Sequence, residues 1–369
     1  SPMGTGKTQF LKRLCEGDGK KIVVVSCRRT LARHLAQELD ALLYINQKAA
    51  DLCNAQRLVI QLESLGMKWA KHHARSGALP TDIDVLAVDE FVSLMMHFGS
   101  DTMAKWRRLC AEALGHLMRH ARTVVLLDAD MTPDAAPLQF VREVAPNRPI
   151  RIVRNITPPD PRRTYTFMNY DALLHKLNEA TDEGVRIGVV CTNRALLHTV
   201  MNALERRGAR GVKVYSSDTS DDDVERDMRS VDDAWADMQV VGFTSTITVG
   251  VDYNGPERTI FAVVDPNSTD AQQVVQMTGR FRKAVAIFVA FTDRDVNNDL
   301  LHLPDTQDEI VLCKKAVMAD AVQRYPDFMT VGMDGSIVMG DTELDRLLAW
   351  VAERCMRSRN HCRREMCYL

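Results

Sequence analysis

Short apolar runs of strand length alternate with longer amphipathic segments along most of this chain of 369 residues. In the first half, strands are predicted at residues 21–26, 57–61, 85–89, 123–128 and 150–154, and helices at 30–43 and 101–120. Strands that are apolar throughout are typical of a parallel sheet that helices cover on both faces. The pattern therefore predicts an α/β fold.

The same alternation resumes after a proline-rich interruption. Residues 155–163 (NITPPDPRR) contain three prolines, which is typical of a linker. Further strands are predicted at residues 164–168, 186–191, 211–215, 239–244, 259–265 and 286–291, with helices at 170–183 and 194–207. We therefore expect two α/β domains, at residues 1–155 and 156–298, followed by a mainly helical extension at 299–369.

Charge and cysteine usage exclude several classes of protein. Lys and Arg total 47 and Asp and Glu total 49, so the chain is neither a strongly basic histone-like protein nor an acidic tail protein. Nine cysteines are scattered without a CxxC pair, which argues against a disulfide framework or a zinc ribbon and favours a reducing compartment. No apolar run reaches the ~20 residues of a membrane span, so we expect a soluble protein without a membrane partner.

The first eight residues, SPMGTGKT, match the phosphate-binding pattern G-x-x-x-x-G-K-[ST], except that Ser1 replaces its first glycine. The backbone of Gly4, Thr5 and Gly6 would curl around a phosphate, and Lys7 would reach the terminal phosphates. The hydroxyl of Thr8 would hold Mg²⁺. The alternative is a chance glycine-rich turn. Because a buried strand leads into such a loop, we expect one before Ser1, which would leave the first domain without its first strand.

Two adjacent carboxylates, Asp89 and Glu90, follow the apolar run VLAVD. At the end of a strand in the same sheet, Asp89 would hold Mg²⁺ and Glu90 would orient or deprotonate the attacking water. Two solvated acids at a strand end are the alternative. Together with the loop, the pair favours hydrolysis of ATP or GTP.

Residues 276–283 read QMTGRFRK, in which Gln276, Gly279 and Arg280 match the Q-x-x-G-R core of the last motif of superfamily 2 helicases. Arg280 and Arg282 would be fingers that reach the γ-phosphate held by the first domain. The usual final arginine of this motif is replaced by Lys283. The alternative interpretation is a basic helix end that faces solvent.

Taken together, the motifs resemble those of superfamily 2 DNA helicases, most closely the herpesvirus-type replication origin-binding proteins. The segments that carry the resemblance are SPMGTGKT (1–8), SCRRTLA (26–32), VIQLESL (59–65), VDEF (88–91), LLDADMT (126–132), VVCTNR (189–194), VGFTSTITVGVDY (241–253) and QMTGRFRK (276–283). The resemblance implies two tandem RecA-like P-loop domains with parallel sheets, a helical C-terminal extension, and ATP and Mg²⁺ as cofactors.

The resemblance also implies that single-stranded nucleic acid is held by its phosphates across both domains. The residues implied are Arg28, Arg29, Gln61, Glu63 and Ser64 in the first domain and Thr192, Asn193, Arg194, Thr244, Ser245 and Thr246 in the second. Hydroxyl groups at strand ends are also ordinary helix caps, which is the alternative for the second group. Gly250 and Asp252 would sense the nucleotide. Asp128 and Asp130 occupy a coupling motif in which Met131 intervenes before Thr132.

These features favour an ATP-dependent DNA helicase or translocase of the origin-binding type. Its partners would be single-stranded DNA, origin duplex and other replication proteins, in the nucleus or at a viral replication site. An RNA helicase and a nucleic-acid-binding remodeller with weak ATPase activity are alternatives, because phosphate contacts do not distinguish the sugars. A P-loop kinase with an unrelated second half would not explain QMTGRFRK.

Overall fold

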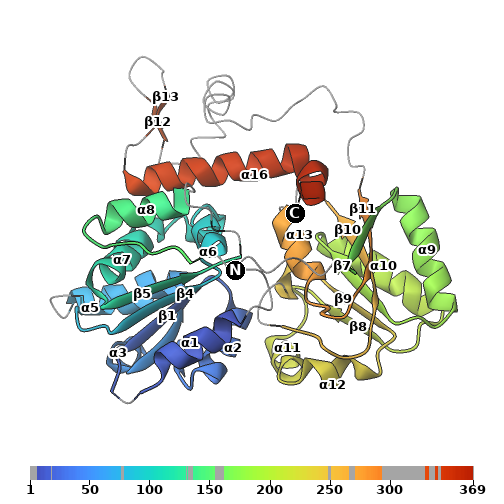
Figure 1. The fold of residues 1–369 in the computed structure, drawn as a ribbon, viewed down its shortest axis with the longest axis horizontal. Helices are drawn as coiled ribbons and strands as arrows, with labels where there is room; N and C mark the ends of the chain where they lie inside the picture. The colour runs from blue at the N-terminus through green and yellow to red at the C-terminus, as the bar shows by residue number, and fades with distance from the viewer. Residues whose placement is uncertain are drawn as a thin grey trace. The chain divides into compact units, whose positions relative to one another are not determined.

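The computed structural model describes residues 6–17, 19–75, 79–129, 131, 136–153, 162–247, 251–265, 271–292, 329–331, 337–339 and 342–368. The chain divides into two compact units, Ser1–Thr157 with Pro304–Arg354 and Pro158–Leu303 with Cys355–Leu369. Each unit is built on a parallel sheet with helices on both faces (Figure 1). The predicted α/β fold with two parallel-sheet domains is thus confirmed.

The first unit contains a five-stranded sheet in the order β2-β3-β1-β4-β5. Its strands are β1 (Ile22–Ser26), β2 (Leu42–Leu43), β3 (Arg57–Gln61), β4 (Val85–Asp89) and β5 (Thr123–Leu127). All neighbours pair in parallel, and β1 lies between β3 and β4. Because β1 and β4 are central and covered on both faces, all of their residues are buried, which explains their unbroken apolar sequences.

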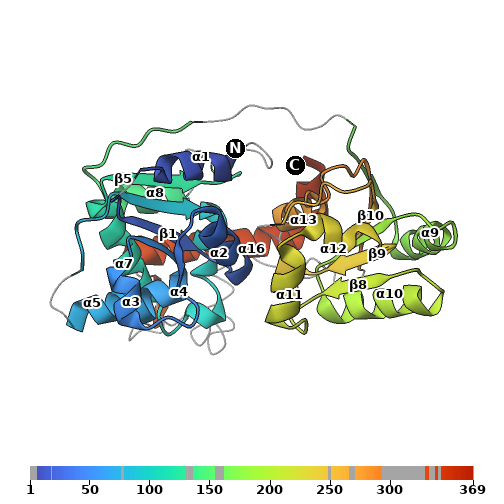
Figure 2. The ribbon, with the colours of Figure 1, turned by 90° about the horizontal axis from the view of Figure 1, so that it is seen from below.

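Helices cover both faces of this sheet. α1 (Lys7–Cys15) and α2 (Arg29–Glu38) lie on one face, and α6 (Phe91–His97), α7 (Arg107–His120) and α8 (Ala136–Val144) lie on the other (Figures 1 and 2). α3 (Ala49–Asn54) contacts the segment 65–70, which in turn packs against α7. Between β3 and β4 the chain forms α4 (Leu62–Ser64), the π-helix η1 (Leu65–Ala70) and α5 (Lys71–Arg75). A Cβ at Gly66 would lie 2.6 Å from the Cys110 sulfur, so this glycine permits η1 to pack closely on α7.

Three predicted elements are wrong in detail. The helix predicted at 101–120 begins only at Arg107, after a short 3₁₀ helix at Asp101–Met103. Residues 150–153 form no strand, and Ile150, Ile152 and Val153 are 38, 48 and 78% exposed. A strand needs a neighbour for its backbone groups, and β5 ends the described sheet with half-buried residues of its own. The helix predicted at 30–43 stops at Glu38, and Leu42–Leu43 pair with β3 instead. The strand expected before the phosphate loop stays a prediction.

The second unit contains a six-stranded parallel sheet in the order β6-β11-β10-β7-β9-β8. Its strands are β6 (Thr164–Phe167), β7 (Ile187–Cys191), β8 (Val212–Tyr215), β9 (Val240–Phe243), β10 (Thr259–Val264) and β11 (Ala286–Phe291). α9 (Tyr170–Asp182) and α10 (Arg194–Arg206) cover one face; α11 (Asp221–Met228), α12 (Val231–Ala236) and α13 (Ala271–Thr278) cover the other. Every strand predicted for this half of the chain is confirmed.

Alternate residues of the central strand β7 enter different cores. Val190 belongs to the core beneath α11, α12 and α13, whereas Val189 and Cys191 belong to the core beneath α9 and α10. Side chains of a strand point to opposite faces in turn, so an apolar strand supplies both cores at once. This arrangement leaves the carboxyl ends of the strands as the edge where polar residues gather.

The C-terminal part contains an antiparallel pair, β12 (Met329–Val331) with β13 (Ile337–Met339), and the long helix α16 (Glu343–Tyr368). Within the first unit, the Arg346 guanidinium lies 3.0 Å from the Glu143 carboxylate of α8. Within the second unit, Met366 joins the core beneath α13. The predicted helical extension at 299–369 is described only in these segments, and it remains a prediction as a domain.

None of the helices in the described residues combines the length and the apolar character that crossing a membrane requires.

Candidate nucleotide and nucleic-acid sites

In the first unit, the predicted nucleotide residues gather at the carboxyl edge of the sheet. Gly6 precedes α1 with φ 80°, a left-handed conformation that glycine adopts without steric cost. Its carbonyl accepts a hydrogen bond from the Phe10 amide and so starts the helix. Lys7 is the first residue of α1, and its ammonium lies 3.6 Å from Oε1 of Glu90. Gly4 and Thr5 lie outside the described residues, and Thr8 lies in the first turn of α1.

The two acidic residues at the end of β4 are both buried, with 5% exposure each. Glu90 has φ 55° and ψ 55°, and Oδ1 of Asp89 accepts its backbone N–H at 3.1 Å. Burial, followed by the charge of Glu90, raises the pKa of Asp89 to about 6. Oε2 of Glu90 is buried and has no hydrogen-bond partner among the described residues. The ionised forms of these groups therefore lack part of the compensation that buried charges need.

The two carboxylates are chemically suited to a divalent cation, and Lys7 beside them is suited to an anion. Mg²⁺ takes oxygen ligands, and its charge would offset the unfavourable burial of the Asp89 carboxylate. A triphosphate would in turn neutralise Lys7, whose side chain is only 12% exposed. The residues present thus fit Mg²⁺ bound with a nucleotide, with Asp89 as the protein's carboxylate ligand.

The raised pKa of Asp89 predicts a pH-dependent stability in the absence of Mg²⁺ and nucleotide. Because the folded protein disfavours the ionised carboxylate, the stabilisation present at low pH is lost as the pH rises through about 6. We expect Asp89→Asn to raise the free energy of unfolding at pH 8 by on the order of 1–3 kcal/mol. The gain should shrink as the pH falls below about 6 in thermal melts. Equal pH slopes for the variant and the parent would contradict this, and Asp171→Asn, at an exposed position, serves as the control.

The predicted phosphate contacts of the first unit lie on neighbouring segments. Arg29 is exposed and begins α2, whereas Arg28 is half-buried at its N-cap position. The side chain of Gln61 is used internally: Oε1 accepts the Tyr44 hydroxyl at 2.5 Å, and Nε2 donates to the Cys27 carbonyl at 3.3 Å. Gln61 therefore holds the segment that carries Arg28 and Arg29. Its predicted role in nucleic-acid binding would then be to support these arginines rather than to contact a phosphate itself.

The adjoining residues of that motif are also engaged. Oε1 of Glu63 lies 2.7 Å from Nε2 of His97 on α6, and Ser64 is half-buried in α4. The Glu63–His97 pair links the segment after β3 to α6, the helix that follows Asp89 and Glu90. Tyr44 and His97 were not identified from the sequence, because single aromatic and histidine residues carry no pattern.

In the second unit, two arginines of the last motif converge on one carboxylate. Oδ1 of Asp252 lies 3.4 Å from Nη1 of Arg280 and 2.5 Å from Nη2 of Arg282. Backbone hydrogen bonds fix this approach, because Tyr253 donates to the Arg280 carbonyl and accepts from the Arg282 amide. The structure thus brings Asp252 together with two other predicted residues, Arg280 and Arg282, which lie 28 and 30 positions further along the chain. Gln276 is buried on the neighbouring α13, and Gly250 lies outside the described residues.

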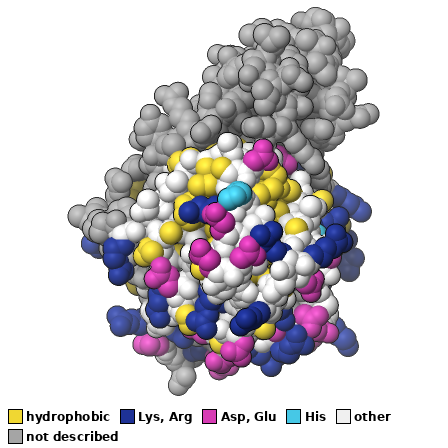
Figure 3. All heavy atoms as spheres, turned by 90° about the vertical axis from the view of Figure 1, so that its right-hand side faces the viewer, with side chains coloured by type: hydrophobic (Ala, Val, Ile, Leu, Met, Phe, Trp, Pro, Cys, Tyr) yellow, Lys and Arg dark blue, Asp and Glu magenta, His cyan; other side chains and the backbone are white. Residues whose placement is uncertain are grey.

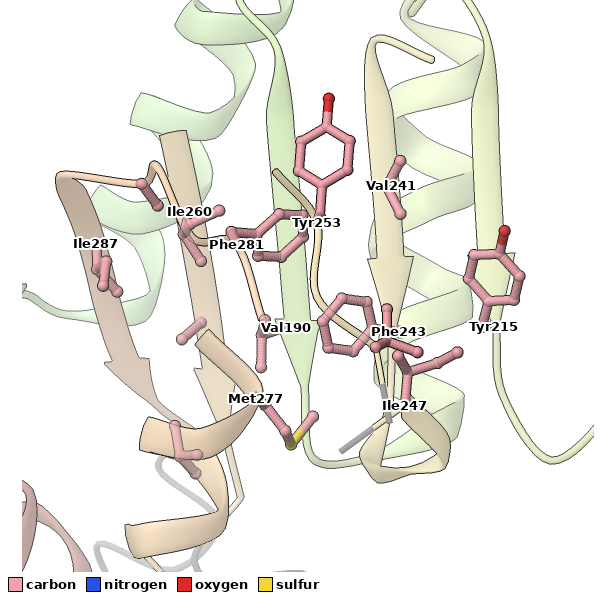
Figure 4. Close-up of a cluster of buried hydrophobic side chains, with 14 of the residues drawn as sticks. Val190, Tyr215, Val241, Phe243, Ile247, Tyr253, Ile260, Met277, Phe281 and Ile287 are labelled. Carbon is pink, nitrogen blue, oxygen red and sulfur yellow. The ribbon is translucent and has the colours of Figure 1, made fainter. Parts of the chain in front are cut away.

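An aromatic cluster supports these arginines. Phe281 points into the core between Arg280 and Arg282, where it lies near Tyr253 and Phe243 (Figure 4). It also contacts the Trp235 ring. A Cβ at Gly188 of β7 would lie 2.6 Å from the Phe281 ring, so this glycine provides the room that the ring occupies. The arrangement holds the backbone of the arginine segment against the sheet.

The predicted phosphate contacts of the second unit carry mostly structural hydrogen bonds. The Thr192 hydroxyl accepts the Asp265 amide at 2.7 Å, and Asn193 caps α10 through the Leu196 amide at 3.2 Å. The buried Thr244 hydroxyl lies 3.0 Å from that of Thr246. These hydroxyl and amide groups therefore also fit the alternative, ordinary caps at strand ends.

Arg194 is the exposed cation of this group, and Nη1 lies 2.6 Å from Oδ1 of Asp218. Ser245 and Thr246 are half-buried in a short 3₁₀ helix after β9. On the side of the second unit seen in Figure 3, cationic and acidic side chains are interspersed. Among the described residues on this side, the cationic side chains do not gather into one broad patch.

The comparisons with known proteins agree with this geometry. Residues 1–169 match the family described as "Origin of replication binding protein". A replication origin-binding protein of Bovine herpesvirus 1.1 (strain Cooper) is 27% identical over 314 residues, which cover 77% of this chain and 36% of that protein. The chain spans about a third or less of the length of the relatives that it matches.

Solved helicase structures share the fold. S. cerevisiae Dbp5 bound to RNA and ADP BeF3 has a TM-score of 0.56 and 14% identity, covering 79% of this chain and 78% of that one. The DUF1998 helicase MrfA bound to DNA has a TM-score of 0.58 and 14% identity, covering 93% and 51%. At these identities the likeness establishes the architecture, two tandem RecA-like domains.

Proposed function

We propose that this chain hydrolyses ATP to move on single-stranded DNA. The premise is that its sequence and its fold both support a superfamily 2 helicase-like origin-binding protein. The observation that carries the proposal is the pair of buried carboxylates, Asp89 and Glu90, with the partly buried Lys7 beside them at the carboxyl edge of the first sheet. Open α/β sheets bind ligands at this edge. The group supplies a cation for phosphate and carboxylates for Mg²⁺ and water.

In this mechanism the residues of the first unit have separate roles. Gly4, Thr5 and Gly6 wrap the phosphates, Lys7 neutralises the terminal ones, and Thr8 with Asp89 holds the metal. Mg²⁺, when bound, offsets the charge of the phosphates. Glu90 orients the water that attacks the γ-phosphorus as the bond to the β-phosphate oxygen breaks.

The second unit would supply the remaining positive charge. Arg280 and Arg282, which lie beside Asp252, would approach the γ-phosphate. Gln276 and Gly250 would complete the nucleotide contacts. Alternating grip on the strand then converts nucleotide binding and release into movement.

The DNA would lie along the phosphate-binding residues of both units. Arg28 and Arg29, with Ser64, would hold it in the first unit, and Arg194 with Ser245 and Thr246 in the second. Guanidinium and hydroxyl contacts to phosphate set position without reading bases. Origin duplex and other replication proteins are proposed as further partners, in the nucleus or at a viral replication site; the name of the bovine herpesvirus relative supports the origin duplex.

The decisive experiment compares the ATPase rate of the protein with single-stranded DNA, duplex DNA and RNA. Stimulation by single-stranded DNA is expected. Stimulation by RNA alone would favour an RNA helicase, because backbone contacts do not separate the two sugars unless the 2′-OH is read. Binding of DNA with negligible turnover would favour a remodeller with weak ATPase activity.

The arginines of the first unit provide a test of the nucleic-acid site. The Arg28→Ala/Arg29→Ala variant is expected to weaken single-stranded DNA binding at every sequence and to reduce its salt dependence, since phosphate contacts release counterions. ATPase activity without DNA should persist. Fluorescence anisotropy over a salt series measures both effects.

A matched control is the Arg186→Ala/Arg206→Ala variant, which removes the same charge from exposed positions of the second unit near the start of β7 and the end of α10. Its DNA affinity should stay near that of the parent. A loss confined to one DNA sequence in the first variant would instead indicate base readout, and equal losses in both variants would contradict the site.

A further inference from the structure

Helix α6 begins directly after the two catalytic carboxylates and lacks a cap from its own N-cap residue. The first amide groups of a helix have no partner within the helix, and the side chain of the N-cap residue usually accepts one of them. Here that residue is Glu90, and its side chain makes no cap hydrogen bond. Its carboxylate lies instead beside the ammonium of Lys7, at 3.6 Å.

Asp128 supplies the missing acceptor from another strand. It follows β5, which pairs in parallel with β4, so the ends of the two strands lie side by side. Oδ2 of Asp128 accepts the backbone N–H of Val92, the second residue of α6, at 2.6 Å. Asp128 is 6% exposed and Val92 is 4% exposed, so water competes little for this bond.

The backbone of Glu90 gives this contact a consequence for catalysis. With φ 55° and ψ 55°, Glu90 occupies the left-handed region, which is unfavourable for a residue with a Cβ. Such a conformation persists only where the surroundings hold it. The Val92 amide lies two residues further along, and its bond to Asp128 fixes the chain on that side of Glu90.

We propose that Asp128 is a positioning residue that caps α6 in place of Glu90 and so leaves the Glu90 carboxylate to the attacking water. The inference rests on the proposed ATP hydrolysis. It also gives a role to an aspartate of the segment LLDADMT, which the helicase resemblance assigns to a coupling motif.

The test compares Asp128→Ala with Asp128→Asn. Alanine removes the acceptor, whereas asparagine keeps a carbonyl oxygen and removes the charge. We expect Asp128→Ala to lower kcat for ATP hydrolysis by about 10²-fold with little change in KM, because small misplacements of a catalytic group have effects of that size. Asp128→Asn should restore most of kcat. Equal losses in both variants would overturn the capping role in favour of a purely electrostatic one.

Two controls separate positioning from a general loss of stability. Asn169→Ala removes the cap of α9, where Oδ1 accepts the Ala172 amide at 2.7 Å, and should lower the melting temperature without lowering kcat. In the Glu90→Gln background, Asp128→Ala should cause no further loss, since it acts through Glu90. Additive losses would show that Asp128 acts independently.

Hydrogen exchange distinguishes failure of this inference from failure of the proposed function. The Val92 amide should exchange faster in Asp128→Ala than in the parent, and near the parent rate in Asp128→Asn, whether or not the protein hydrolyses ATP. Absence of ATPase activity in the parent would overturn the proposed function. Unchanged Val92 exchange in Asp128→Ala would overturn the cap itself.

Discussion

Replacing Arg280 by alanine is expected to lower kcat for ATP hydrolysis by about 10³-fold or more, while the affinity of the protein for ATP changes little. An arginine finger acts mainly on charge that develops in the transition state, so its loss affects turnover more than ground-state binding. Arg282→Ala should show a smaller loss. Steady-state kinetics and nucleotide titrations measure the two quantities separately.

The Arg280 result needs a check on folding, because the side chain is 7% exposed and contacts both Asp252 and the Val251 carbonyl. The melting temperature of the variant should therefore be measured beside its kinetics. Arg206→Ala, at an exposed position of α10 in the same unit, is the matched control and should keep the parent rate. Unchanged turnover in the Arg280 variant would refute an active site that draws on both units.

The second large effect is expected for Glu90→Gln, which should lower kcat by about 10² to 10³-fold and leave ATP bound. Glutamine keeps the size of the side chain, but it cannot accept the proton of the attacking water. Single-turnover assays with labelled ATP would show retained nucleotide without release of phosphate.

Glu38→Gln is a suitable control for this change, because Glu38 pairs with Lys12 at the half-exposed surface of the first unit. It should hydrolyse ATP at the parent rate. Hydrolysis at the parent rate by Glu90→Gln would show that VDEF is not the hydrolysis motif, whatever the Asp128 variants do.

The elements of the fold were largely predictable, because most of them are local. Apolar runs such as those of β1, β4 and β7 are buried on both faces, and four or five apolar residues in succession carry that information directly. Residues 150–153 show the limit of this argument. Three of these four residues are apolar, but without a neighbouring strand among the described residues they stay exposed. Pairing, unlike periodicity, depends on what lies beside a segment.

Within the candidate sites, the sequence by itself determined the groups that neighbour one another along the chain. Gly6 with Lys7, Asp89 with Glu90, and Arg280 with Arg282 are each set by one turn, one strand end or one short segment, so their spacing was sufficient.

Only the tertiary structure decided which distant groups hold these residues in place. Asp128 reaches the Val92 amide because β5 lies next to β4, and Tyr44 reaches Gln61 because the segment around Tyr44 runs beside β3. Such bonds depend on strand order, and a buried polar group takes whatever partner that order brings within reach. The physical reason is that the chemical type of each side chain is fixed by its own position in the sequence. The partner that a buried side chain finds for its hydrogen bond is fixed by which distant segments the fold places beside it.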